Sequence, residues 1–92
     1  MYEFECDIYK SRANEVKHSV SFEEAVTVFG DPLAIYFDDD EHSIGENRGI
    51  IIGNSMKDRL LLVVYIETDV KIRIISSRLL TKKEKKDYEN KE

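Results

Sequence analysis

Cysteine occurs once in this chain of 92 residues, and no long apolar run occurs at all. The single cysteine, Cys6, excludes an internal disulfide, and such sparse use is typical of the reduced cytoplasm. The longest apolar run, residues 60–66, is too short for a membrane-spanning helix. Residues 1–7 lack the basic and apolar regions of a signal peptide. We therefore expect a soluble cytoplasmic protein with no membrane partner.

Glycine and proline are also scarce, with four residues and one, and no glycine-rich phosphate-binding loop is present. The sequence has no repeat, low-complexity tract or linker, so residues 1–92 should form a single domain. Neither a Ser-His-Asp nor a Cys-His signature of nucleophilic catalysis is readable. The apolar share of 41% is enough for a folded core.

The N-terminal part predicts a short strand followed by a helix. Alternating residue types over residues 2–6 indicate a half-buried strand, and Asp7 can cap a helix that runs to about Val16. Within that helix Tyr9, Ala13 and Val16 share one face by their i, i+4, i+7 spacing. We expect this face to pack on the core.

A second helix has the clearest local signals. Ser21 and Glu24 have the spacing of a capping box, in which each side chain accepts from the other residue's backbone N–H. Gly30 and the only proline, Pro32, end the helix. The apolar residues that share one helical face are Phe22, Ala25, Val26 and Phe29. This face should also pack on the core.

Beyond the proline the pattern changes to strands and ends in a charged helix. Four strands are predicted, at residues 33–37, 48–53, 59–66 and 71–76. The third is apolar on both faces and belongs at the centre of the sheet, and short connections make these neighbours antiparallel. Thr81 and Glu84 repeat the capping-box spacing before a helix that only Tyr88 can anchor. The order β-α-α-β-β-β-β-α predicts an α+β fold with a small antiparallel sheet, two N-terminal helices and a weakly docked C-terminal helix.

Charge is distributed unevenly along the chain. Residues 1–46 hold three basic residues against twelve acidic ones, and residues 71–92 hold eight against four. The basic end could bind an RNA backbone, and the acidic part suits a basic protein partner. A solvated surface of both signs remains the alternative. The net charge of −5 disfavours a nucleic-acid-binding regulator acting alone.

Three candidate features are weak on the residues alone. Residues 38–42 are acidic with one histidine, but they lack the glycine of a calcium loop and the second histidine of a zinc site. A solvated acidic loop is therefore favoured. Cys6 has no basic neighbour that would activate it, so a buried, inert thiol is favoured. His18 precedes the second helix, where a lone histidine is more often structural than catalytic.

Arginines are the more informative candidates. Lys71 and Arg73 project from one face of a strand because the side chains alternate. Arg78 follows at the strand's end, and Arg48 begins another strand, two residues after Glu46. Guanidinium groups can bind the phosphate of an RNA backbone through two N–H donors. The alternative, surface arginines paired with the many acidic residues, stays open.

A series of short blocks along the chain has a recognisable pattern. The blocks are residues 17–25 (KHSVSFEEA), 28–33 (VFGDPL), 42–43, 46–48 (ENR), 52–53, 59–60, 63–65 (VVY), 67, 72–78 (IRIISSR), 84 and 88. Together with the segment Phe4 to Asp7, they follow one another in order to about Tyr88, over nearly the whole chain. In this series the sequence resembles the BrnT family of toxins.

The resemblance implies a RelE-like fold and a toxin that halts translation by cutting RNA, without a metal or other cofactor. Its implied partner is a BrnA-type antitoxin with a ribbon-helix-helix DNA-binding domain, so that DNA would be contacted only through the antitoxin. The 2′-hydroxyl of the RNA would attack the adjacent phosphate while protein groups move protons and stabilise charge.

On this resemblance we assign roles to particular residues. Arg73 and Arg78 would stabilise the phosphate, with Arg48 as their helper. The remaining assignments are Glu46 or His18 as general base, Tyr88 as proton donor or stacking surface, and Lys71, Lys82 and Lys83 as RNA-binding residues.

The sequence departs from the family pattern at three positions. Cys6 stands where relatives usually have tryptophan, Ser19 where they have glycine, and Thr68 where they often have arginine. The loss of an aromatic ring and of a basic group could weaken RNA cleavage. The alternative is therefore a catalytically weak remnant that acts only as an antitoxin-binding module.

Overall fold

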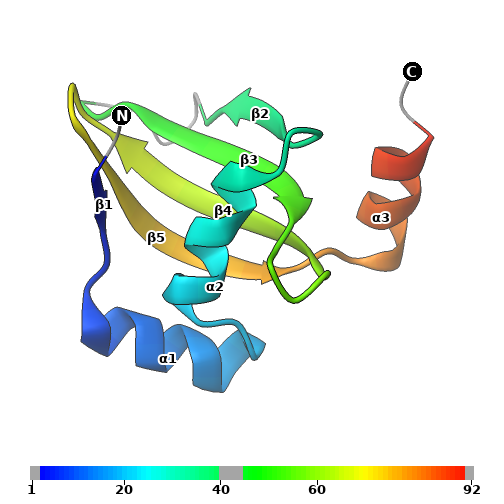
Figure 1. The fold of residues 1–92 in the computed structure, drawn as a ribbon, viewed down its shortest axis with the longest axis horizontal. Helices are drawn as coiled ribbons and strands as arrows, with labels where there is room; N and C mark the ends of the chain where they lie inside the picture. The colour runs from blue at the N-terminus through cyan, green and yellow to red at the C-terminus, as the bar shows by residue number, and fades with distance from the viewer. Residues whose placement is uncertain (1–2, 40–44, 91–92) are drawn as a thin grey trace.

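The computed structural model describes residues 3–39 and 45–90, which form three helices, a short 3₁₀ turn and five strands (Figure 1). The helices are α1 (Ile8–His18), α2 (Phe22–Thr27) and α3 (Lys82–Glu89), and the turn η1 (Val28–Gly30) continues α2. The strands are β1 (Glu3–Glu5), β2 (Ile35–Asp38), β3 (Arg48–Asn54), β4 (Leu60–Glu67) and β5 (Lys71–Leu79). The expected element order and the α+β class are confirmed. Residues 40–42 of the expected acidic loop lie outside the described residues, as do residues 43 and 44.

The strands form one sheet in the order β1-β5-β4-β3-β2, so the expected central strand, β4, lies in the middle. Strands β2 to β5 are antiparallel neighbours, as expected. β1 instead pairs parallel with β5, which makes the sheet mixed rather than wholly antiparallel. The helices between β1 and the other strands are the reason, because a long helical connection lets a strand join the sheet in parallel. This pairing sets Glu5 beside Arg73.

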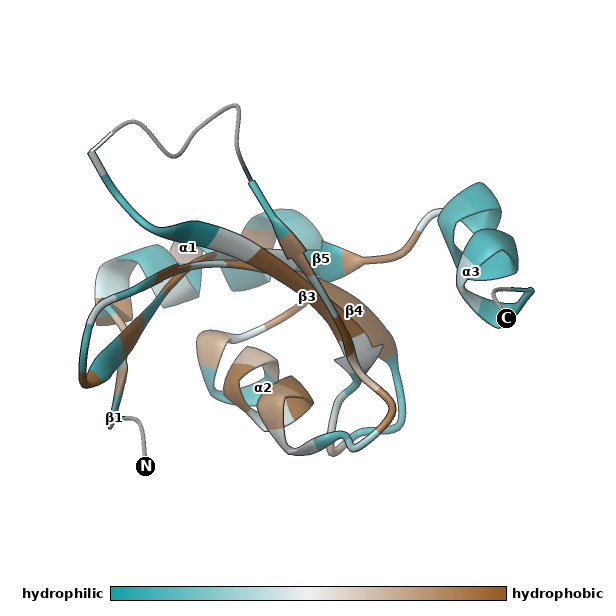
Figure 2. Cartoon of the chain, turned by 90° about the horizontal axis from the view of Figure 1, so that it is seen from above, coloured by the Kyte–Doolittle hydropathy of each residue, from teal (hydrophilic) through white to brown (hydrophobic). Residues whose placement is uncertain are grey.

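The core lies between α2 with η1 and one face of the curved sheet (Figure 2). Phe22 and Ala25 are buried, and Val26 and Phe29 are partly buried against them, which confirms the expected core face of this helix. The buried hydrophobic side chains of the sheet are Ile51, Leu61, Val63, Tyr65, Ile72 and Ile74. The other face of the sheet is not covered by α2 and carries the side chains that alternate with these.

α1 does not pack as the sequence suggested. Its expected core face is open to solvent, with Tyr9 79% and Val16 90% exposed. The helix instead turns the polar residues Ser11 and Asn14 inward. Asn14 Nδ2 donates to the backbone oxygens of Val20 and Ser77, both at 2.8 Å, and its Oδ1 accepts from the Ser77 N–H at 3.1 Å. The expectation was wrong because these bonds satisfy buried backbone groups that an apolar face would leave without partners.

The two expected capping boxes differ in outcome. At α3 both halves form, between Thr81 and Glu84. At α2 only Ser21 caps the backbone N–H of Glu24, because the Glu24 carboxylate is buried against Arg59 and Ser55 instead. The Arg59 hydrogen bond, opposed by burial, lowers the pKa of Glu24. This pair fixes the β3–β4 hairpin to α2.

α3 is the least embedded helix. None of its described residues is buried, in agreement with the weak docking that its sequence suggests. Tyr88 donates to the Leu33 oxygen at 3.2 Å, and Glu84 binds Arg78. Over residues 3–39 and 45–90, no helix has the length and apolar character needed to cross a membrane.

Candidate functional site

A bulge in β5 decides which way its basic side chains point. Ile74 pairs with Tyr65, but Ser76 pairs with Val64, so Ile75 is an extra residue in β5. Before the bulge, Ile72 and Ile74 are buried while Lys71 and Arg73 are exposed, as the alternation predicts. After it the pattern shifts by one. After the bulge Ser77 is buried, and Ser76 and Arg78 are partly exposed. The bulge therefore brings Arg78 to the same face as Arg73.

The register places the three candidate arginines at different distances from one another. Ile66 of β4 pairs with Arg48 on one side and with Arg73 on the other. These two arginines are thus two strands apart, about 10 Å between backbones at the usual strand spacing. Arg78 lies five residues further along β5, roughly 15 Å from Arg73 at about 3.3 Å per residue. In the structure these two arginines, which the sequence grouped, are bound to different glutamates, Arg73 to Glu5 and Arg78 to Glu84.

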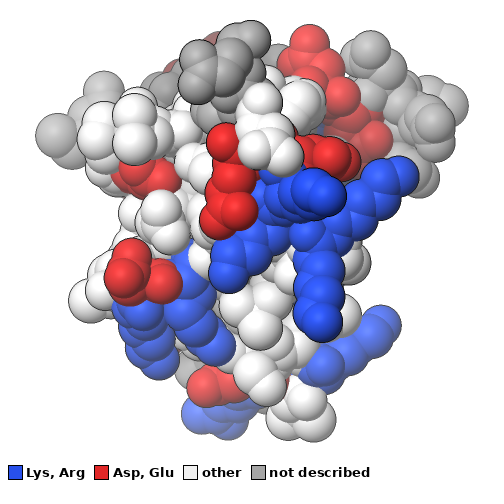
Figure 3. Space-filling model, turned by 90° about the vertical axis from the view of Figure 1, so that its right-hand side faces the viewer, with Lys and Arg blue, Asp and Glu red and all other residues white. Residues whose placement is uncertain are grey.

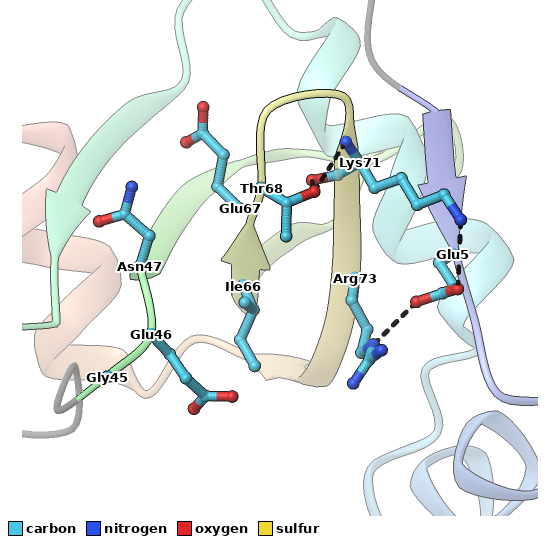
Figure 4. Close-up of a pocket in the computed structure, with 9 residues that line it drawn as sticks. All are labelled: Glu5, Gly45, Glu46, Asn47, Ile66, Glu67, Thr68, Lys71 and Arg73. Carbon is cyan, nitrogen blue, oxygen red and sulfur yellow. Dashed lines mark hydrogen bonds and ion pairs between the residues drawn. The ribbon is translucent and has the colours of Figure 1, made fainter.

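A hollow of about 380 Å³ opens beside the β4–β5 hairpin, and we call it the hairpin hollow (Figure 4). Its lining residues are Glu5, Gly45, Glu46, Asn47, Ile66, Glu67, Thr68, Lys71 and Arg73. Three of the candidate site residues, Glu46, Lys71 and Arg73, thus meet here, and Thr68 lies beside them. Figure 4 shows Glu46 approaching from the segment before β3 and Arg73 from β5, on either side of Ile66. The hollow combines two cations with three carboxylates.

Glu5 fixes the orientation of Arg73. The Arg73 Nε donates to Glu5 Oε1 at 2.8 Å, and Lys71 Nζ lies 3.9 Å from Glu5 Oε2. The hydrogen bond from Arg73 lowers the pKa of Glu5, so this carboxylate is ionised. The same bond raises the pKa of Arg73, with a smaller contribution from Glu46. Because Nε is engaged, the two terminal nitrogens of Arg73 are the ones that can turn to a ligand.

Arg48 lies at the margin of this hollow rather than in its lining. Its Nη2 is 3.8 Å from Glu46 Oε1, and its side chain is 25% exposed. It lines a smaller hollow of about 50 Å³ with Tyr65, Glu67 and other residues of that corner. Arg48 can thus act on the hairpin hollow through Glu46.

The remaining candidates lie away from the hairpin hollow. Arg78 donates to both oxygens of Glu84, at 2.8 and 2.9 Å, and this bond is the largest cause that lowers the pKa of Glu84 to about 2. Lys82 and Lys83 are exposed on α3, on the side of the molecule where Figure 3 shows a group of basic side chains. Tyr88 is in a hollow of about 250 Å³ between α3 and strands β2 and β3.

His18 lies in the last turn of α1 and lines none of the hollows described here. The sequence reasoning did not find Glu5. The alternation of β1 indicated a surface position, but only the pairing of β1 with β5 brings Glu5 to Arg73. The structure therefore gathers Glu46, Lys71 and Arg73 with Glu5, and it places Arg78, Tyr88, Lys82 and Lys83 near α3.

Comparison with known proteins identifies the fold and the family. A search of curated proteins finds no match. In a crystal structure, the Brucella abortus ribonuclease toxin BrnT has the same fold, with a TM-score of 0.69 and 18% identity over 89% of this chain and 100% of that one. A family model described as "Ribonuclease toxin, BrnT, of type II toxin-antitoxin system" matches residues 7–84. The chain therefore belongs to the BrnT family of ribonuclease toxins.

Proposed function

We propose that this chain is an endoribonuclease that acts in the cytoplasm and stops translation by cutting RNA. The observation that carries the proposal is the meeting of Arg73, Lys71 and Glu46 in one hollow open to solvent. A guanidinium beside a carboxylate is the pairing that phosphate cleavage needs, since one group stabilises charge and the other moves a proton.

The reaction follows from these three groups. The Glu46 carboxylate takes the proton from the 2′-hydroxyl of the RNA, and the resulting oxygen attacks the adjacent phosphate. The terminal nitrogens of Arg73, held by the Nε bond to Glu5, stabilise the charge of the pentavalent transition state. The bond to the 5′ oxygen then breaks, with Lys71 as the proton donor. The products are a 2′,3′-cyclic phosphate and a 5′-hydroxyl, and no step uses a metal ion.

The partner we propose is a BrnA-type antitoxin with a ribbon-helix-helix domain. Membership of a type II toxin–antitoxin family supports a protein antitoxin. Residues 1–46 hold twelve acidic residues and three basic ones, which favours a basic segment of the antitoxin as the part that docks on this chain. DNA would then be reached only through the antitoxin.

A second candidate function, an antitoxin-binding module without catalysis, is favoured by a separate observation. Each candidate arginine is close to a glutamate: Arg48 to Glu46, Arg73 to Glu5 and Arg78 to Glu84. These carboxylates compete with phosphate for the guanidinium groups. In a protein without catalysis, the three arginines would stay in these ion pairs and would bind no phosphate.

RNA cleavage by the purified chain in the presence of EDTA distinguishes the two functions. We expect fragments with 2′,3′-cyclic phosphate ends from the unaltered chain and a loss of at least a hundredfold in rate for Glu46→Gln. The exposed Glu89→Gln on α3 is the matched control and should cut at the normal rate. Intact RNA with the unaltered chain, together with a stable antitoxin complex, would establish the binding module instead.

A further inference from the structure

A second hollow lies on the other side of Arg73. Its volume is also about 380 Å³, and its lining residues are Glu5, Cys6, Asp7, Lys10, Arg73 and Ile74. We call it the Cys6 hollow. It shares only Glu5 and Arg73 with the hairpin hollow, so the ion pair of these two residues separates two spaces of similar size.

The edge of the sheet explains why this space is open. β1 pairs with β5 only as far as Arg73, and β5 continues beyond it without β1. The chain leaves β1 at Cys6 and enters α1, whose N-cap is Asp7. The hollow thus lies between the end of β1, the start of α1 and the edge of β5. Volumes of ~300–1,000 Å³ are typical of sites for small ligands.

Lys10 is the cation in the Cys6 hollow that is not held by a carboxylate. Asp7 already accepts from the backbone N–H groups of Tyr9 and Lys10, at 2.8 and 3.2 Å, and Glu5 is bound to Arg73. The Lys10 ammonium has no ion pair within the described part of the chain. Lys10 is therefore the cation of this hollow that can bind a phosphate without breaking an ion pair, although the Asp7 and Glu5 carboxylates keep their charge.

Cys6 is exposed, so the expectation of a buried thiol was wrong, but the thiol does not supply a nucleophile in this hollow. Partial loss of water contact is the main cause that raises the pKa of its thiol, and the nearby carboxylates of Glu23 and Glu5 raise it further. The thiol is therefore protonated at neutral pH, which is unsuited to covalent catalysis. The hollow is a place for binding rather than for a second reaction.

We infer that the Cys6 hollow receives the nucleotide next to the phosphate held by Arg73, with Lys10 binding the following phosphate. This inference rests on the proposed function, because it extends the same RNA strand. A strand held at Arg73 continues in both directions, and the two hollows are the spaces on either side of that residue. The strand then crosses the sheet edge over the Glu5–Arg73 pair towards the start of α1, and not towards α3.

Alkylation of Cys6 tests the occupancy of the hollow directly, because this is the only cysteine and it is exposed. Iodoacetamide is applied with and without a short RNA that carries 2′-O-methyl groups and cannot be cut. RNA binding is followed separately by fluorescence anisotropy. At saturating RNA we expect the alkylation rate to fall at least tenfold. The control Cys6→Ser/Lys57→Cys places the thiol in the β3–β4 turn, where RNA should give no protection.

Two charge-matched variants test the phosphate contact on the same helix. Lys10→Ala should weaken RNA binding severalfold and reduce the slope of log affinity against log salt by about 0.7, the value for one phosphate of a single strand. Lys17→Ala, exposed at the other end of α1, should change neither. Bound RNA that leaves Cys6 unprotected, or an unchanged slope for Lys10→Ala, overturns this inference but not the proposed function. Failure of any RNA to bind overturns both.

Discussion

Substitution of Arg73 separates catalysis from folding. The arginine is 57% exposed, and its ion pair with Glu5 is also at the surface. The neighbours that hold the strand in the core are Ile72 and Ile74, which are 5% and 1% exposed. Since exposed ion pairs contribute little to folding, we expect Arg73→Ala to keep the melting temperature within about 5 °C of the unaltered chain.

The effect on cleavage should be much larger. Loss of one charged donor from the transition state costs a hundredfold or more in rate. Arg73→Lys should recover only part of this rate, because one ammonium cannot hold Glu5 and also span two phosphate oxygens. Glu5 would then bind the lysine or Lys71, and the phosphate would lose its oriented donors.

Single-turnover cleavage of RNA, with a thermal melt of each variant, measures both effects. Arg12→Ala is the matched control, because Arg12 is an exposed arginine on α1 that lines neither hollow beside Arg73. An unfolded Arg73→Ala protein would refute the surface role of this residue. A folded variant that cuts RNA at the full rate would place the active site elsewhere.

Four further predictions follow from the structure and the family. Asn14→Ala removes three hydrogen bonds to buried backbone groups, so urea unfolding should show a loss of about 3 kcal/mol, with an unchanged slope. The pKa of Glu84 is depressed from 4.5 to about 2, so its ion pair with Arg78 stabilises α3 fully above pH 4.5 and is lost as the pH falls through about 2. NMR signals of Tyr88 should report this release of α3, and in Arg78→Ala they should show no change over this pH range. Antitoxin association, followed by stopped flow, should slow as ionic strength rises from roughly 0.05 to 0.5 M, whereas a rate indifferent to salt would exclude electrostatic steering. Induced expression without antitoxin should arrest growth and protein synthesis before membrane integrity falls, and normal growth with abundant soluble protein would favour the binding module.

Local patterns predicted those parts of the fold that depend on residues close together in the sequence. The apolar stripe of α2 and the two-faced apolar run of β4 each placed an element correctly. The inward face of α1 could not be predicted, since it depends on backbone groups of Val20 and Ser77 that meet Asn14 only in the folded chain. Hydrophobic spacing gives no signal for such polar contacts.

The candidate site was also predictable from the sequence only in part. Alternation along the strand placed Lys71 and Arg73 on one face, and both line the hairpin hollow. The bulge at Ile75 was not visible in the sequence, so neither the face of Arg78 nor its distance from Arg73 could be predicted. Glu5 escaped notice because parallel pairing between distant segments leaves no local pattern.

The pairing of β1 with β5 also sets the order in which the site is assembled during synthesis. Glu5 leaves the ribosome before its partner Arg73, which follows 68 positions later. The segments of α1 and α2 are therefore synthesised while the chain still lacks the cation proposed to bind RNA. The proposed cutting site is therefore completed only after β5 has been released, so the proposed nuclease cannot act before that point of its own synthesis.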